Sequence, residues 1–134
     1  MQLSKQLKAF TLVELIMVVT IIGMMAVFVI PNYNKSVAKA YEKAASNNLL
    51  IIYAAQQNES NNNNSYKAGA NVGVINSNLG LSIIANNMDY VCTSPGNSFT
   101  CTAARDDGSF TLTITNASPT VCCGAGTCPS IPDC

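Results

Sequence analysis

The sequence predicts an α+β protein in which a long amino-terminal helix packs on a small antiparallel sheet of about three strands. Three observations predict this fold. The predominantly apolar run Phe10–Ile30 holds 21 residues, enough to cross a bilayer as a helix. Apolar residues continue at steps of three and four after Pro31. In the last third of the chain, apolar and polar residues alternate between turn residues, which is typical of strands.

Composition limits the size and the chemistry of the protein. The chain has 134 residues, enough for one small domain beyond the apolar segment. Seven basic and seven acidic residues balance, so we expect no specific nucleic-acid partner. Histidine, the commonest acid–base residue of enzymes, is absent and few carboxylates cluster. The sequence therefore predicts a protein that is not an enzyme, with no cofactor and no metal site.

Glu14 is the one charged residue in the apolar segment. A carboxylate in a membrane is costly and is expected to have a cationic partner. Cleavage after Ala9 would supply that cation, because Phe10 would then carry an amine whose usual pKa is about 8. The amine would lie one helical turn from Glu14 of its own chain, or near Glu14 of a neighbouring chain. Removal of the leader Met1–Ala9 would leave the apolar helix on the mature protein.

The expected helix contains two weak points and then continues. Gly23 lowers helix stability, and Pro31 lacks an N–H and predicts a kink. We expect the helix to resume and run to about Gln57, followed by an exposed connection over Asn58–Ser65 and a short helix around Ile75–Asn86. The stripe expected to face the sheet comprises Val37, Tyr41, Ala44, Asn48, Ile52 and Ala55.

Three strands are expected, over Asp89–Thr93, Ser98–Ala104 and Ser109–Thr115. The turn Ser94–Asn97 and the hairpin turn Asp107–Gly108 fix their register. In that register the apolar residues of the three strands lie on one face of the sheet, which we expect to pack on the helix. The face consists of Tyr90, Cys92, Phe99, Cys101, Ala103, Phe110, Leu112 and Ile114. The opposite face is rich in threonine.

Six cysteines in a small chain with a membrane segment predict disulfides in an oxidising compartment. They are Cys92, Cys101, Cys122, Cys123, Cys128 and Cys134. The strand register places Cys92 opposite Cys101, at a separation that a disulfide tolerates. Cys122 and Cys123 are adjacent in the chain. Each is expected to bond one of the two remaining cysteines, Cys128 and Cys134, and which pairs with which stays open. These bonds would tie down a carboxy-terminal loop, Ala117–Cys134.

The amino-terminal residues resemble a known family. The run Lys8-Ala9-Phe10-Thr11-Leu12-Val13-Glu14-Leu15, followed by Gly23 and by Pro31 in Val29-Ile30-Pro31, resembles the signature of type IV pilins and of type II secretion pseudopilins. The resemblance covers about the first 35 residues, with Ala9 where the family usually has glycine. It implies that a membrane prepilin peptidase cuts between Ala9 and Phe10 and methylates the Phe10 amine. It also implies three parts: a leader (1–9), a membrane and filament-core helix (10–31) and a pilin globular domain (32–134) that includes the second half of the helix.

By this resemblance the chain is expected to be the structural subunit of a type IV pilus, used for adhesion, motility or DNA uptake. The precursor would sit in the inner membrane and then enter an extracellular homo-oligomeric filament through the pilus assembly machinery. In that filament, Glu14 would pair with the Phe10 amine of the subunit assembled before it. Two alternatives remain: a pseudopilin of a periplasmic type II secretion pseudopilus, and a minor tip adhesin. The cysteine-tied tail favours the pilin.

Overall fold

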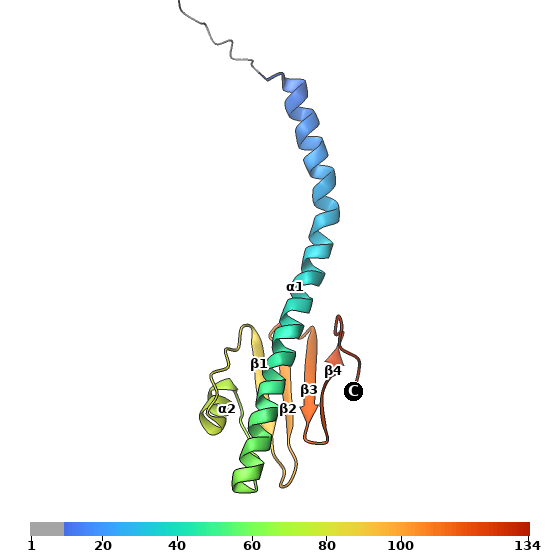
Figure 1. Ribbon diagram of the computed structural model, residues 1–134. Helices are drawn as coiled ribbons and strands as arrows, with labels where there is room; N and C mark the ends of the chain where they lie inside the picture. Colours follow the sequence, from blue (N-terminus) through green and yellow to red (C-terminus); the bar gives the residue numbers. More distant parts are fainter. Residues whose placement is uncertain (1–9) are drawn as a thin grey trace, which may run out of the picture. The chain divides into compact units, whose positions relative to one another are not determined.

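The computed structural model describes residues 10–134, which fall into two compact units, one ending at Ser36 and the other comprising Val37–Cys134. In chain order the elements are α1 (Leu12–Asn63), α2 (Val72–Leu79), β1 (Met88–Thr93), β2 (Thr100–Arg105), β3 (Phe110–Thr115) and β4 (Ser118–Gly126). The second unit, called the body below, contains the second half of α1, which lies across one face of the sheet (Figure 1).

The helix α1 is continuous between Leu12 and Asn63, and both Gly23 and Pro31 lie inside it. A bend at these two residues stays a prediction. The expected end near Gln57 and the exposed connection after it were wrong, because the Asn-rich segment continues the helix. Side-chain bonds four residues apart support this last turn: Asn62 donates to Asn58 (3.3 Å) and Asn63 donates to Glu59 (2.8 Å).

The antiparallel sheet has the order β1-β2-β3-β4. Its register confirms the pairing predicted from the two turns, with Cys92 opposite Cys101, Tyr90 opposite Ala103 and Ala103 opposite Leu112. All eight residues of the predicted apolar face are buried. The long helix and the antiparallel sheet thus form the expected α+β arrangement within the body.

The prediction of about three strands was wrong, because a fourth strand forms where a loop was expected. β4 pairs with β3, placing Cys123 opposite Leu112 and Cys122 opposite Thr113, and the register shifts twice along the pair. Pro119 and two glycines are untypical of strands, so the sequence did not reveal this one. Proline is tolerated in an edge strand, where its missing N–H interrupts no hydrogen bonds between strands.

The short helix α2 begins and ends earlier than expected, and its caps explain its bounds. The side chain of Asn71 accepts a hydrogen bond from the Val74 N–H at the first turn. Gly80, with φ of 64°, ends the helix in the left-handed conformation that glycine adopts without strain.

The face of α1 that packs on the sheet also differs from the expected stripe. Its buried residues follow steps of three and four: Glu42, Ala45, Leu49, Ile52 and Gln56. Only Ile52 belongs to the predicted set. The pattern was misleading because a glutamate and a glutamine occupy the two ends of the buried face, where a search for apolar residues passes over them.

Candidate functional site

The first half of α1 presents apolar side chains along its length. The large apolar side chains that the structure describes between Leu12 and Ile30 have exposed fractions from 52% to 75%. An 18-residue window of this helix has a mean hydropathy of 2.7, so the helix is long and apolar enough to cross a membrane. Such a surface needs lipid or other apolar surfaces to cover it.

Glu14 and Thr11 form a reciprocal cap at the start of this helix. The Thr11 N–H donates to Glu14 Oε2 (2.9 Å), and the Thr11 hydroxyl donates to the same oxygen (3.0 Å). In return, the Glu14 N–H donates to Thr11 Oγ1 (3.2 Å). This is a capping box, which satisfies N–H groups that have no partner within the helix. The Thr-x-x-Glu spacing was visible in the sequence, but its capping role was not predicted.

The carboxylate is also well placed for an external cation. Phe10, the residue expected to carry the mature amine, is 85% exposed and lies just before the capped turn. The carboxylate of Glu14 is exposed, and both hydrogen bonds that it accepts come from Thr11. Ala9, on the other side of the expected cleavage point, lies outside the described residues.

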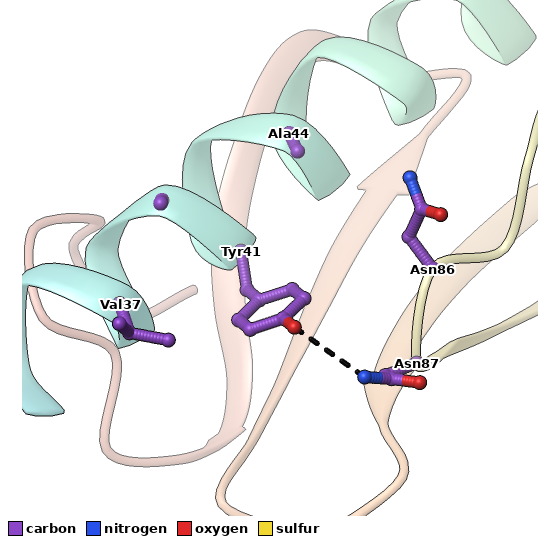
Figure 2. Close-up of a pocket in the computed structure, with 6 residues that line it drawn as sticks. Val37, Tyr41, Ala44, Asn86 and Asn87 are labelled. Carbon is purple, nitrogen blue, oxygen red and sulfur yellow. Dashed lines mark hydrogen bonds between the residues drawn. The ribbon is translucent and has the colours of Figure 1, made fainter.

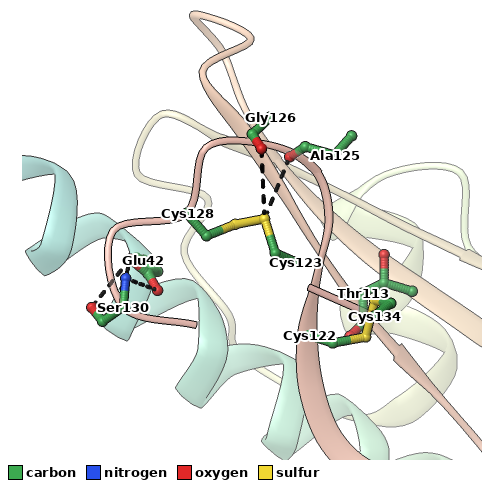
Figure 3. Close-up of a disulfide and its surroundings, with 9 residues drawn as sticks. All are labelled: Glu42, Thr113, Cys122, Cys123, Ala125, Gly126, Cys128, Ser130 and Cys134. Atoms are coloured by element: carbon green, nitrogen blue, oxygen red, sulfur yellow. Dashed lines mark hydrogen bonds between the residues drawn. A yellow bond between two sulfur atoms is a disulfide. The ribbon is translucent and has the colours of Figure 1, made fainter. Parts of the chain in front are cut away.

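In the body, the predicted bond between Cys92 and Cys101 joins neighbouring strands β1 and β2. The other four cysteines pair as Cys122–Cys134 and Cys123–Cys128. Adjacent cysteines on β4 thus hold two points of the segment Thr127–Cys134, called the tail below (Figure 3). Backbone hydrogen bonds also fix the tail on β4. The Cys123 N–H donates to the Pro132 carbonyl (2.7 Å), and the Cys134 N–H donates to the Cys123 carbonyl (3.1 Å).

The tail closes over a buried carboxylate. Glu42 is 1% exposed, and both its oxygens accept from the Ser130 N–H at 3.1 Å (Figure 3). The Ser130 hydroxyl also donates to Glu42, at 3.4 Å. A buried charge is tolerated only with such partners. The disulfides that hold the tail therefore also hold in place the Ser130 N–H and hydroxyl, which donate to Glu42.

Gln56 closes the other end of the buried helix face. Its Oε1 accepts from the Lys67 N–H at 2.9 Å, and its Nε2 donates to the Lys67 carbonyl. Between the two ends, Asn48 donates to the Tyr90 hydroxyl (2.9 Å). Burial of Tyr90 raises the pKa of its hydroxyl, and the bond from Asn48 offsets part of that rise.

A polar cluster joins α1 to the corner where β1 begins and β2 ends. Asn87 donates to the Tyr41 hydroxyl at 3.3 Å (Figure 2). The Arg105 guanidinium lies 4.9 Å from the centre of the Tyr41 ring and pairs with Asp107 at 3.2 Å. Hydrogen bonds from Ser109 lower the pKa of Asp107.

The structure thus pairs the six predicted cysteines and places Glu14 on an exposed apolar helix. Sequence reasoning missed Glu42, Gln56 and Tyr41 as the polar residues that join α1 to other segments of the body. Each has a partner at least 11 residues away, so no local pattern signals it. In comparisons with family models, curated proteins and solved structures, nothing matches this chain.

Proposed function

We propose that this chain is the structural subunit of a type IV pilus filament. One observation carries the proposal: a helix that is exposed and apolar along its first half holds a single carboxylate one turn from the expected mature amino terminus. The resemblance of the first 35 residues to type IV pilins supports it. Neither a nucleophile nor an acid–base pair enters the proposed role, which is assembly.

In the membrane, lipid covers the apolar half of α1. When the subunit leaves the membrane, the same surface is covered by the helices of neighbouring copies. Glu14 then selects the position at which a new copy stops, because an unpaired charge in an apolar core costs several kcal/mol. The Phe10 amine of the preceding copy provides the partner. A head-to-tail contact that does not close on itself gives an open helical filament.

The alternative within the same class is a pseudopilin of a type II secretion machine. One feature supports the pilus subunit instead, namely the tail that two disulfides hold on β4. Surface fibres sheared from cells and containing this chain support the pilus. Material confined to the periplasm supports the pseudopilus. A minor tip adhesin would be present at only a few copies per fibre.

The capping box makes a sharp test of Glu14 possible. Glu14→Gln keeps a side-chain acceptor for the cap but removes the charge. Thr11→Val removes the hydroxyl of the cap and keeps the charge. We expect Glu14→Gln to lower the yield of sheared fibres by about tenfold or more, since a lost ion pair of over 1.4 kcal/mol corresponds to that factor. Thr11→Val is expected to stay within about threefold of the parent chain.

Membrane fractionation of both variants provides the control, because each should reach the membrane at the parental level. The mass of the fibre subunit should correspond to a chain that starts at methylated Phe10. Parental fibre yield from Glu14→Gln would contradict the proposed pairing. A loss in Thr11→Val as large as that in Glu14→Gln would show that assembly depends on the cap as much as on the charge, and would also contradict the proposed pairing.

A further inference from the structure

Two lysines of the body lack an ionic partner within the part of the chain that the structure describes. The ion pairs found among residues 10–134 are Lys67–Glu59 and Arg105–Asp107. Lys39 and Lys43 take part in neither, and both are exposed, four residues apart on α1. Side chains at this spacing lie on the same face of a helix, so their like charges add.

These lysines lie on the β4 side of the body. Lys39 and Lys43 line a depression of about 410 Å³ together with Ser130 and Ile131 of the tail. The tail itself is bonded to β4. The nearby Glu42 is buried and accepts from Ser130, and Asp133 is held on the same edge of the body by its bridge to Cys123. Lys39 and Lys43 therefore present two exposed positive charges on this side of the body.

Two exposed carboxylates lie toward the other edge of the sheet, which β1 forms. Asp89 belongs to β1, and Asp106 follows β2. The Asp106 N–H donates to the Asn87 carbonyl at 3.2 Å, which brings the turn after β2 against the start of β1. Asp89 and Asp106 are therefore neighbours at one corner, called the acidic corner below.

The lysines and the acidic corner lie on opposite sides of the part of α1 that contains Tyr41. Asn87 and Arg105, which flank the acidic corner, both contact Tyr41. Lys39 and Lys43 each lie two residues from Tyr41, which is about 200° around a helix with 3.6 residues per turn. Their side chains thus point away from the acidic corner, and the opposite charges cannot meet within one copy.

From this geometry we infer that Lys39 and Lys43 of one copy dock on Asp89 and Asp106 of a second copy. The inference deepens the proposed function, on which it rests. Two complementary surfaces on opposite sides of one body give a head-to-tail contact, which builds an open filament when its rotation does not close. Single exposed ion pairs contribute little stability, so this contact acts mainly by rejecting wrong registers that bring like charges together.

Charge reversal tests the inference in the full chain. Lys39→Glu with Lys43→Glu makes both surfaces acidic, and Asp89→Lys with Asp106→Lys makes both basic. We expect each double variant to lower the yield of sheared fibres by about tenfold or more, because like charges then face each other. The chain with all four changes has complementary surfaces again, and its yield should return to within about threefold of the parent.

Co-expression of the two double variants gives a second measure. Neither variant should assemble alone, and together they should form mixed fibres that contain both chains in about equal amounts. Glu59→Lys with Lys67→Glu is the matched control, because it reverses both members of an ion pair outside the two surfaces and should leave the yield near the parental level. Non-reducing gels should show intact disulfides in the membrane pool of every variant.

Two outcomes would overturn the inference: double variants that assemble like the parent, or folded double variants that are not rescued by the combined changes. In either case the proposed function would stand if the parent chain still forms fibres and Glu14→Gln does not. A parent chain that is never found in fibres would overturn both.

Discussion

At the scale of single residues, the polar side chains on the buried face of α1 decide how the helix sits on the sheet. Glu42 accepts from Ser130, 88 residues further along the chain, and Gln56 accepts from and donates to Lys67. Every buried side-chain nitrogen and oxygen in residues 10–134 has a hydrogen-bond partner. Polar residues at both ends of a buried apolar face resist sliding and rotation, because any shift leaves them unpaired.

Glu42→Ala is expected to lower the free energy of unfolding by about 1–3 kcal/mol, because the Ser130 N–H loses the acceptor that the buried Glu42 supplies. Glu42→Gln keeps an oxygen acceptor and should lose less. Denaturant unfolding of the detergent-solubilised chain with its disulfides intact, followed by circular dichroism, measures both changes. Equal stability of the parent chain and Glu42→Ala would contradict the structural role of this contact.

At the scale of elements, the turns between strands determine the sheet. Strands β1, β2 and β3 alternate buried and more exposed residues, and their turns are short, so the register was readable before the structure. β4 departs from that pattern and is fixed by close backbone approach. Gly126, with φ of 81°, lies against Ser109 and Phe110, where an added Cβ would come within 2.8 Å of Phe110 Cα.

Gly126→Ala is therefore expected to destabilise the pairing of β3 with β4. Gly96→Ala is the matched control, since Gly96 has a similar φ of 78° but open space around it. The control should lose about 1 kcal/mol for its left-handed backbone. Gly126→Ala should lose at least about 1 kcal/mol more from the steric clash. Denaturant unfolding compares the two variants, and equal losses would argue against the close approach.

At the scale of the whole molecule, the chain divides into a part that lacks a core and a part that has one. Within residues 10–134, the buried hydrophobic residues lie between Ala45 and Cys123, in the body. The described residues of the part ending at Ser36 expose their apolar side chains, which need lipid or other apolar surfaces to cover them. This division suits a subunit that folds before it assembles.

The body, Val37–Cys134, is therefore expected to fold alone when produced in an oxidising compartment. Size-exclusion chromatography should find a monomer, because the apolar half of α1 is absent. Dispersed amide resonances and protection of all six cysteines from alkylation should accompany it. The reduced fragment serves as the comparison and should be less stable by a few kcal/mol, since disulfides constrain the unfolded chain. Aggregation of the oxidised fragment would mean that the body needs the missing half of α1.

The sequence by itself determined the features that depend on neighbours in the chain. The apolar length of α1, the register of Cys92 opposite Cys101 and the apolar face of three strands follow from hydropathy, period and turn length. The tertiary structure alone decided which face of α1 is buried, that β4 is a strand, and how Cys122 and Cys123 choose their partners. The physical reason is distance along the chain. Glu42 becomes a buried residue only when Ser130 reaches it, and β4 becomes a strand only when β3 supplies its hydrogen bonds.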